Sequence, residues 1–548
     1  MHIEKVIIEN FKIYEGRFEI NFNNGLNILV GDNEAGKSTI LEAIHLALTG
    51  LLNGRNLRSE LTEYLFNNRV VKKYIDSLKD ETKQSLPYIL IEIYIAGDDC
   101  PKFEGDSNLT KTGACGISFR IAFDDKYQIE YEELVKNSDV KTLPIEYYDI
   151  FLETFARENI THRRLPLKSA LIDSSSNRYQ NGSDIYISRI VRDHLEPTDI
   201  VNISQAHRKM RESFMNSSSI KLINQKIQNN EVLSGKKVEL SVELLSKNAW
   251  ENSLMTYLNK IPFHFLGKGE QCIVKTELAL SHKKSQEANI ILVEEPENHL
   301  SHTKLNQFIN RIQNRQKDKQ IIISTHSSFV ANKLGLDKLI LLNDKKTLRL
   351  EELKDSTTNF FEKISGYDTL RLILCRMAIL VEGDSDELIV QKAYMSSNNG
   401  KLPIEDQIDV ISVGTSFLRF LEIASALKKE VVVVTDNDGD VKSLEEKYSE
   451  YINENKKENI KICYDAEIDS GSLLIGGKNF NYNTLEPKLL KVNNLKILNR
   501  IYNTKCKNED DMHKHMRTNK TDCALKVFDS EEAIKFPNYI LEAISTIQ

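Results

Sequence analysis

The segment from Gly31 to Ser38 reads G-x-x-x-x-G-K-S, a pattern whose residue types suit a bound phosphate group. Gly31 and Gly36 allow the backbone to approach an anion closely, so that successive N–H groups and the start of the next helix point at phosphate oxygens. Lys37 adds a positive charge for the outer phosphates, and the hydroxyl of Ser38 or Thr39 suits Mg²⁺. The pattern therefore predicts a nucleotide site.

The flanks of this loop predict the strand and the helix that would hold it. Residues 26–30 read LNILV, which is typical of a buried strand, and Leu41, Ile44 and Leu48 share one helix face until Gly50. The alternative is a glycine-turned loop that matches the pattern by chance. The strand and the helix on either side favour the nucleotide site over that alternative.

Two adjacent carboxylates follow a second apolar run, residues 290–293. ATP hydrolysis needs one acidic group for the Mg²⁺ shell and another to orient the attacking water, and we assign these roles to Glu294 and Glu295 in that order. His326, after a further apolar run, stands where it could sense the γ-phosphate. An acidic pair or a single histidine is usually structural, but their order behind the phosphate loop favours function.

A second group of acidic residues occurs in the C-terminal half. Glu382 follows the apolar run AILV, and Asp386 comes one helical turn later, whereas Asp436 and Asp438 follow VVVVT and are two residues apart. Carboxylates that converge at strand ends suit Mg²⁺ or Mn²⁺, and two such ions can act on a phosphodiester. The alternative is a pair of solvated acidic loops that cap helices, which is the better interpretation of either motif alone.

The composition limits what surrounds these motifs. The chain has 548 residues and a net charge of −7, so affinity for nucleic acid must come from local basic patches. Its seven cysteines form no C-x-x-C pair and no His/Cys cluster, which argues against zinc and a disulfide framework and predicts a reduced, cytoplasmic setting. With no N-terminal signal pattern and no apolar run of membrane-spanning length, we expect a soluble protein.

Four ordered segments resemble the motifs of ABC-type ATPases of the DNA-repair and chromosome-maintenance branch. They are the phosphate loop within VIIENFKIYEGRFEINFNNGLNILVGDNEAGKST, the signature-like LGKGEQ (266–271), ILVEEPENHL (291–300) and IIISTHSS (321–328). Two positions depart from the usual pattern: Gly267, Lys268 and Gly269 replace Ser-Gly-Gly, and Glu294 replaces Asp. A conventional ATP sandwich across two subunits is therefore in doubt. The resemblance implies contacts to ATP from Gly31, Asn33, Gly36, Lys37, Ser38, Thr39, Gly269, Glu294, Glu295 and His326.

The acidic motifs of the C-terminal half resemble a Toprim domain, and an ABC-type ATPase followed by Toprim resembles the overcoming-lysogenisation-defect (OLD) family of nucleases. SVGTSF (412–417) is similar to that family's glycine turn, Glu486 to its late acidic residue, and Lys520 to its lysine near the cleaved phosphate. The resemblance implies catalytic roles for Glu295, Glu382 and Lys520. It implies metal ligands at Ser38, Glu294, Glu382, Asp386, Asp436, Asp438 and Glu486.

This reading predicts an α/β protein with the ATPase domain in two parts, 1–145 and 263–355. A helical insertion at 146–262, compact and without a long heptad run, suits dimerisation or DNA contact, and the Toprim domain covers 356–548. We expect ATP and Mg²⁺, or Mn²⁺ in the Toprim site, to serve as cofactors. DNA is the expected substrate, and a homodimer or a dimer of dimers the expected assembly.

The family resemblance further implies a role in bacterial anti-phage defence, sometimes beside a helicase or a reverse transcriptase. Two other functions are open. A Toprim topoisomerase or primase needs a nucleophilic tyrosine in a DNA-gate domain, or a zinc-binding or helicase-docking module, and neither is visible. An ATP-regulated DNA-binding scaffold with an inactive Toprim domain would lack at least one acidic ligand, and all are present.

Overall fold

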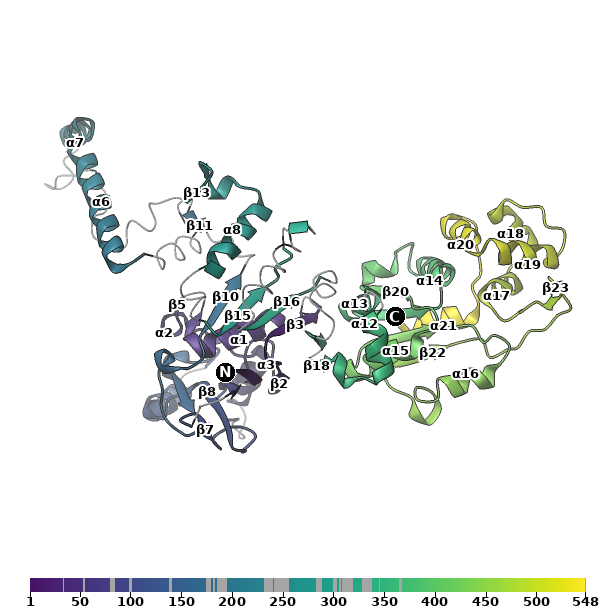
Figure 1. Cartoon of the computed structure of the whole chain (residues 1–548), viewed down its shortest axis with the longest axis horizontal. Helices are drawn as coiled ribbons and strands as arrows, with labels where there is room; N and C mark the ends of the chain where they lie inside the picture. The colour runs from purple at the N-terminus through teal and green to yellow at the C-terminus, as the bar shows by residue number, and fades with distance from the viewer. Residues whose placement is uncertain are drawn as a thin grey trace. The chain divides into compact units, whose positions relative to one another are not determined.

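The computed structural model divides into two compact units, one of residues 1–26 and 38–324 and the other of residues 27–37 and 325–548. The helices and strands of both units are labelled in Figure 1. The residues that the structure describes are 1–32, 34–52, 55–78, 84–97, 101–137, 140–173, 179–180, 183–184, 195–230, 240, 256–281, 288–298, 303–304, 307, 319–327, 338–343, 345–363 and 367–547.

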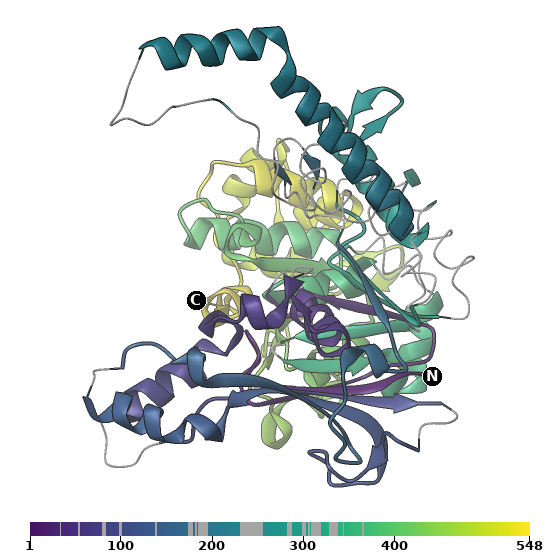
Figure 2. The same cartoon turned by 90° about the vertical axis from the view of Figure 1, so that its left-hand side faces the viewer.

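An antiparallel sheet occupies the N-terminal part of the first unit, and Figure 2 shows its long strands side by side. Alternating and β-branched residues such as YILIEIYI predict these strands, which pack aliphatic side chains into the core. The order is β2-β1-β6-β8-β7, with β9 also paired to β8. The strands are β1 (His2–Glu9), β2 (Arg17–Asn21), β6 (Ile89–Ala96), β7 (Glu104–Gly105), β8 (Ala114–Phe123) and β9 (Tyr148–Thr154).

Three parallel strands of a second sheet belong to this unit. They are β10 (Ser169–Asp173), β15 (Ile290–Glu294) and β16 (Gln320–Thr325), with β15 in the middle. Ile172 pairs with Val293, and Val293 pairs with Ile323, so the strands are aliphatic along both faces, as strands buried in a parallel sheet are. The apolar run 290–293 before Glu294 forms most of β15, and the apolar run before His326 lies in β16.

Residues 146–262 were expected to form a helical insertion, and its first part does not. Strand β9 extends the antiparallel sheet and β10 pairs with β15, so residues 148–173 contribute to the two sheets. Two helices follow, α6 (Pro197–Asn216) and α7 (Ser218–Asn230), joined by a bend at Ser217 that is visible in Figure 2. Residues 231–239 and 241–255 of the expected insertion lie outside the described residues.

The other described elements of the first unit are short or local. The helices are α1 (Lys37–Thr49), α2 (Leu57–Glu60), α3 (Asn68–Ser77), α4 (Gln128–Asn137) and α8 (Lys268–Ser281). The hairpins are β4 (Leu51–Leu52) with β5 (Arg55–Asn56), β11 (Tyr179–Gln180) with β12 (Ser183–Asp184), and β13 (Tyr257–Leu258) with β14 (Ile261–Pro262). Helix α1 confirms the face predicted from Leu41, Ile44 and Leu48, because all three side chains are buried.

The second unit begins with the strand of the phosphate loop. Strand β3 (Leu26–Gly31) runs parallel to β17 (Leu339–Asn343), with Gly31 opposite Leu342, and β17 pairs antiparallel with β18 (Lys346–Arg349). The helices α12 (Asp355–Lys363) and α13 (Tyr367–Leu374) then lead into the C-terminal sheet.

The C-terminal sheet has four parallel strands in the order β20-β19-β21-β22. Its strands are β19 (Met377–Val381), β20 (Ile408–Ser412), β21 (Glu430–Val434) and β22 (Ile460–Cys463), followed by the hairpin β23 (Leu474–Ile475) with β24 (Lys478–Asn479). Its helices are α14 (Asp384–Ser397), α15 (Phe417–Leu427), α16 (Val441–Lys447), α17 (Leu485–Val492), α18 (Leu495–Tyr502), α19 (Glu509–Thr518), α20 (Lys520–Asp529) and α21 (Asn538–Ile547).

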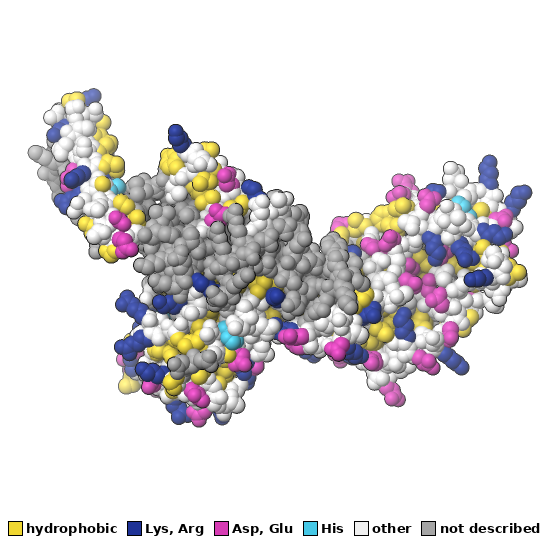
Figure 3. Space-filling view, viewed as in Figure 1, with side chains coloured by type: hydrophobic (Ala, Val, Ile, Leu, Met, Phe, Trp, Pro, Cys, Tyr) yellow, Lys and Arg dark blue, Asp and Glu magenta, His cyan; other side chains and the backbone are white. Residues whose placement is uncertain are grey.

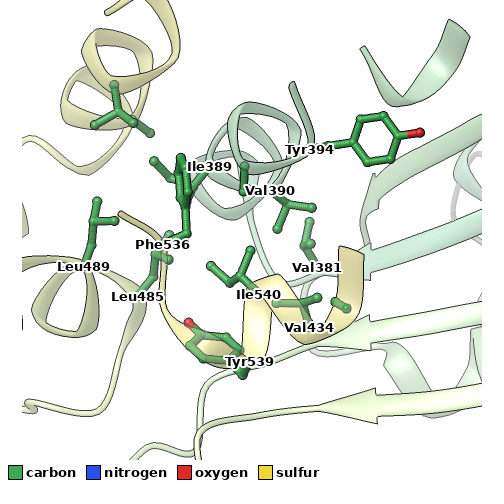
Figure 4. Packing of buried hydrophobic residues seen from close by; sticks show 14 of the residues in the cluster. Val381, Ile389, Val390, Tyr394, Val434, Leu485, Leu489, Phe536, Tyr539 and Ile540 are labelled. Carbon is green, nitrogen blue, oxygen red and sulfur yellow. The ribbon is translucent and has the colours of Figure 1, made fainter. Parts of the chain in front are cut away.

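One hydrophobic cluster joins the elements at the end of this sheet (Figure 4). Val381 and Val434 are the last residues of the two central strands, and Ile389, Leu489 and Ile540 reach the same cluster from α14, α17 and α21. Fully burying one such side chain contributes about 1.5–3 kcal/mol. Strand ends and helix starts are therefore fixed to one another where the acidic residues of the C-terminal half lie.

Candidate functional site

The two central strands of the C-terminal sheet place two acidic motifs side by side. Strands β19 and β21 are parallel neighbours, with Leu380 opposite Val433, and they end at Val381 and Val434. Glu382 directly follows the first strand, and Asp436 follows the second after one residue. Since parallel strands end at the same edge of a sheet, the residues that the sequence predicted as ligands lie at one edge.

Asp386 lies in the first turn of α14, where it accepts a hydrogen bond from the backbone N–H of Gly383 at 3.1 Å. It thus caps the helix that Glu382 and Gly383 introduce. Burial, followed by repulsion from the carboxylates of Glu486 and Glu382, raises the pKa of Asp386 to about 7. Asp386 is therefore both a structural cap and a member of the acidic group.

Asp436 is held from α17, because its Oδ2 accepts a hydrogen bond from the backbone N–H of Leu485 at 3.2 Å. Burial raises the pKa of Asp436 well above its usual range, and the nearby Asp386 and Glu486 raise it further. Asp438 is exposed and has φ of 49°, in the left-handed region, and its Oδ1 accepts from Nδ2 of Asn481 at 3.0 Å. The backbone of the D-x-D segment therefore turns at Asp438, and its two carboxylates have different partners: Leu485 for Asp436 and Asn481 for Asp438.

Glu486 and Lys520 form an ion pair, with Nζ 2.9 Å from Oε1. The other carboxylate oxygen, Oε2, accepts from the hydroxyl of Thr484 at 3.2 Å. Burial alone would lower the pKa of Lys520, but the attraction of Glu486, and then of Asp436 and Asp386, raises it overall. Lys520 is the first residue of α20, and its side chain is half exposed.

Helix α20 is tied to α14, which carries Asp386. Nζ of Lys392 on α14 donates to the carbonyl oxygens of Phe528 at 2.8 Å and Ser530 at 2.7 Å, at the end of α20. The glycine turn 412–417 is also in place, since the N–H of Gly414 donates to the carbonyl oxygen of Glu382 at 3.1 Å. These contacts fix the backbone on either side of the acidic group.

Sequence reasoning missed two residues of this site. Tyr539 on α21 is buried, and burial, followed by the charges of Asp436 and Asp386, raises its pKa well above 10. Figure 4 shows its ring in the hydrophobic cluster at the end of the sheet. Asn437, between the two aspartates, is buried and donates to the carbonyl oxygens of Asp465 and Glu467, in the loop after β22. A single tyrosine some hundred residues downstream carries no signal, whereas an amide inside D-x-D could have been noted as a turn residue.

The acidic group fits a hard divalent cation by the chemistry of its donors, which are carboxylate oxygens brought close enough to raise one another's pKa. As the side chains lie, however, no three His, Cys, Asp or Glu residues within the described part of the chain are arranged to hold one ion. Glu382, Asp386, Asp436, Asp438 and Glu486 would therefore have to turn toward a shared cation in order to bind it.

The phosphate loop follows β3 and is closed by Lys37. The Nζ of this buried side chain donates to the carbonyl oxygens of Gly31 at 2.8 Å and Asp32 at 2.7 Å. A Cβ on Gly31 would lie 2.6 Å from the carbonyl oxygen of Leu342, so glycine is also required by packing against β17. Gly36 has φ of 89°, a conformation that favours glycine. Asn33, predicted to contact ATP, lies outside the described residues.

Glu294 and Glu295 occupy the predicted position at the end of β15. The N–H of Glu295 donates to the carbonyl oxygen of Ser324 at 3.0 Å, and its carboxylate accepts from Nδ2 of Asn298 at 2.8 Å. Glu295 has φ of 40°, and a non-glycine residue in the left-handed region costs on the order of 1–3 kcal/mol and is concentrated at functional sites. His326 comes two residues after Ser324, beyond the neighbouring strand.

The remaining predicted nucleotide contacts lie at helix starts. Ser38 and Thr39 are in the first turn of α1, Ser38 exposed and Thr39 buried. Gly269 is the second residue of α8, so the signature-like segment does open a helix. Gly31 to Lys37 of the phosphate loop and the Glu294–Glu295 pair belong to different units, so the geometry of each motif is defined within its own unit only.

The surface charge is mixed. On the face that Figure 3 shows, basic and acidic side chains are interspersed over the C-terminal unit, in keeping with the small net charge. Among the helices that the structure describes, none is long and apolar enough to span a membrane.

Comparison with known proteins matches two parts of the chain to two families. Residues 1–331 match the AAA ATPase domain, and residues 373–438 match the TOPRIM domain of overcoming lysogenization defect protein-like proteins. Endonuclease GajA of Bacillus cereus is 24% identical, over 90% of this chain and 81% of its own length. The Rad50 double-strand break repair ATPase of Methanopyrus kandleri is 56% identical over 46 residues, which are 8% of this chain and 5% of that protein.

Among solved structures, an Smc head bound to the C-winged helix domain of ScpA is 16% identical and covers 64% of this chain and 99% of its own, with a TM-score of 0.32. The sequence families and the order of the motifs, rather than this structural likeness, decide the classification. An ABC-type ATPase fold is followed by a Toprim domain, as the sequence predicted. The chain belongs to the AAA ATPase domain family and, through its C-terminal TOPRIM domain, to the OLD family of ATPase–Toprim proteins.

Proposed function

We propose that this chain is an ATP-hydrolysing, metal-dependent DNA endonuclease. The observation that carries the proposal is the acidic group at one edge of the C-terminal sheet, where Asp386 and Asp436 have raised pKa values and Lys520 lies beside Glu486. The similarity to a protein named as an endonuclease over 90% of this chain supports it.

In this proposal Glu382, Asp386, Asp436 and Asp438 are metal ligands, and Glu486 is an additional one. Divalent cations bound there would supply charge stabilisation to the attacking and leaving oxygens of a phosphodiester. Lys520 is placed to stabilise the negative charge that gathers on the phosphate oxygens in the transition state. Tyr539, a buried neutral phenol, can donate a hydrogen bond without adding charge.

In the ATPase part we propose that Lys37 and the backbone of the phosphate loop bind the phosphates of ATP, with Ser38 and Glu294 near Mg²⁺. Glu295 orients the attacking water, and its constrained backbone fixes the direction of the carboxylate. His326 senses the γ-phosphate, and Gly269 lies at the signature-like helix start. Thr39 and Asn33 complete the expected contacts.

The proposal extends to the biological setting implied by the family. We propose a cytoplasmic homodimer or dimer of dimers that acts on DNA in bacterial anti-phage defence, with a helicase or a reverse transcriptase as a partner encoded nearby.

An ATP-regulated scaffold with an inactive Toprim domain is the second candidate. One observation favours it, namely that no three potential ligands in the described residues are arranged to hold an ion. Incubating the purified chain with supercoiled and linear DNA, in Mg²⁺ or Mn²⁺ and with or without ATP, separates the two. Cleavage that Asp436→Ala abolishes supports the nuclease, while intact DNA under every condition, from a chain that still hydrolyses ATP, supports the scaffold.

A further inference from the structure

Lys488, a buried lysine two residues after Glu486, contacts the loop 465–469, and no residue of this loop has a predicted role in the site. The loop 465–469 follows β22 and carries Asp465, Glu467 and Asp469 at alternate positions. Nζ of Lys488, on α17, lies 2.7 Å from Oδ2 of Asp465 and 2.6 Å from Oδ2 of Asp469, and donates to the carbonyl oxygen of Glu467 at 2.8 Å. Its three N–H bonds thus have three acceptors on one short loop.

The ammonium of Lys488 is buried, so the loss of its contacts would cost more than the loss of an exposed ion pair. Lys488 is 2% exposed, whereas Lys491, one turn later on α17, pairs with Asp469 and Glu467 but is 44% exposed. Removing one partner of a buried ion pair leaves uncompensated charge and is strongly destabilising locally, while an exposed pair contributes little. The two lysines therefore form a matched pair of contacts to the same loop, one buried and one exposed.

The same loop is also held by the D-x-D segment. Nδ2 of Asn437 donates to the carbonyl oxygens of Asp465 at 2.5 Å and Glu467 at 3.0 Å, and Asn437 is buried. Asn437 stands between Asp436 and Asp438, two of the proposed ligands. A shift of the loop would therefore move the backbone that carries both carboxylates.

A second connection runs from the loop to Asp438. The N–H of Asp469 donates to Oδ1 of Asn483 at 2.7 Å, and Nδ2 of Asn483 returns a bond to the carbonyl oxygen of Asp469 at 2.8 Å. The N–H of Asn483 donates to Oδ1 of Asn481, whose Nδ2 binds Asp438. Gly439, with φ of 84°, leaves room for Asn483, because a Cβ there would lie 3.2 Å from its Nδ2.

We propose that Lys488 is a positioning residue for the metal site: its ammonium clamps the loop 465–469 to α17 and so fixes Glu486, two residues before it, relative to Asp436 and Asp438. The inference rests on the proposed nuclease function. Lys488 itself touches neither metal nor DNA. It acts as an internal cation that compensates the carboxylates of Asp465 and Asp469 and holds the backbone of Glu467.

The test compares Lys488→Met with Lys491→Met in the full chain without nucleotide. Mn²⁺ binding is followed by electron paramagnetic resonance of the free ion, and single-turnover cleavage of plasmid DNA is measured at saturating Mn²⁺. We expect Lys488→Met to weaken Mn²⁺ binding at least about tenfold and to slow cleavage at saturating metal, with Lys491→Met within about twofold of the parent. Lys488→Arg, which restores the charge, should recover part of both losses.

Each outcome decides between the alternatives. A folded Lys488→Met chain with parental Mn²⁺ affinity and cleavage overturns the proposal, as does an equal loss in Lys491→Met. If Lys488→Met does not fold, the combined variant with Asp465→Asn and Asp469→Asn leaves no buried charge unpaired and should fold with weakened Mn²⁺ binding; parental affinity there also overturns the proposal. A parent chain that binds Mn²⁺ but cuts no DNA defeats the proposed function alone, because the binding measurements still decide the role of Lys488.

Discussion

Nζ of Lys520 lies 2.9 Å from Oε1 of Glu486, so a residue proposed to stabilise the cleaved phosphate and a residue proposed to bind metal form one ion pair. Because Thr484 holds the other oxygen of Glu486, the carboxylate is fixed at both ends. A cation that binds Glu486 competes with Lys520 for the same oxygen. Metal binding at Glu486 would therefore release the Lys520 ammonium, which could then approach a phosphate.

Lys520→Ala should lose most DNA cleavage while it keeps metal binding. Removing the ammonium takes a positive charge away from Glu486, so Mn²⁺ affinity should stay near the parental value or rise slightly. The transition state loses a charged donor, and such losses slow chemistry by about 10²–10³-fold. Single-turnover cleavage at saturating Mn²⁺ measures the rate, and titration with Mn²⁺ measures the affinity.

The control for this variant is Lys526→Ala. Lys526 lies on the same helix, α20, but pairs with Asp522, which is exposed. Cleavage by Lys520→Ala at the parental rate would remove the residue from the mechanism. A matching loss of metal affinity would give it a structural role. Asp436→Ala, in contrast, should lose metal binding and cleavage together.

Mn²⁺ binding should strengthen as the pH rises through neutrality. The pKa of Asp386 is raised to about 7, so below that pH a cation must displace a proton before the carboxylate can bind it. We expect the affinity to increase between pH 6 and 8 and then to level off. Asp386→Asn should bind Mn²⁺ more weakly and with a flatter pH profile. A parental affinity that is independent of pH over this range contradicts the prediction.

The stability of the metal-free chain should follow the opposite trend. Folding raises the pKa of Asp386 from an ordinary value of 3.8 to about 7, so folding favours its protonated form. Its contribution to the free energy of unfolding is complete below pH 3.8 and is lost as the pH rises through about 7. Thermal melts in a metal chelator should show the C-terminal unit melting lower at pH 8 than at pH 5.5. The difference should be smaller in Asp386→Asn.

Lys37→Ala and Glu295→Gln should separate ATP binding from ATP hydrolysis. Lys37→Ala removes the charge expected on the outer phosphates and should weaken ATP binding at least about tenfold. Glu295→Gln keeps the size of the side chain and its contact with Asn298 but cannot orient water as a carboxylate does, so it should bind ATP and hydrolyse it slowly. Equilibrium binding and turnover are measured for each, with Lys73→Ala as an exposed control. Parental turnover in both variants would defeat the assignment.

Part of the site could be predicted because its acidic residues Glu382 and Asp436 follow the ends of strands. The runs AILV and VVVVT are aliphatic enough to be buried parallel strands, and the carboxylates after them must then lie at one edge of the sheet. Glu486 and Lys520 could not be reached in that way. They lie on α17 and α20, and only the resemblance to a family brought them together in advance.

Other features depend on packing that no local pattern encodes. Lys488 is one of many lysines in the sequence, and its burial against Asp465 and Asp469 follows from how α17 lies on the loop. Strand β10 was placed in a helical insertion because it is short and its partner β15 is more than a hundred residues away. Residues 169–173 (SALID) form a strand because they pair with the distant β15, and their composition alone does not indicate it.

Self-association is the last prediction, and α6 offers the surface for it. Met210 and Phe214 lie one turn apart on one face of this helix and are 59% and 52% exposed. Hydrophobic side chains line one side of the α6–α7 segment in Figure 3. Fully burying each of these two side chains against a second copy would contribute about 1.5–3 kcal/mol. We therefore expect a homodimer, or a dimer of dimers, that uses this face.

The test is the combined variant Met210→Asp and Phe214→Asp, which places two charges on the proposed contact. Light scattering at micromolar concentration, with and without ATP, should show a larger species for the parent and a smaller one for the variant. Thr198→Asp combined with Gln205→Asp adds the same charge at exposed polar positions on the other side of α6 and should leave the parental size unchanged. A parent that is strictly monomeric with and without ATP rejects self-association. A double variant that keeps the parental size moves the contact to another surface, because two buried aspartates facing their copies would repel one another.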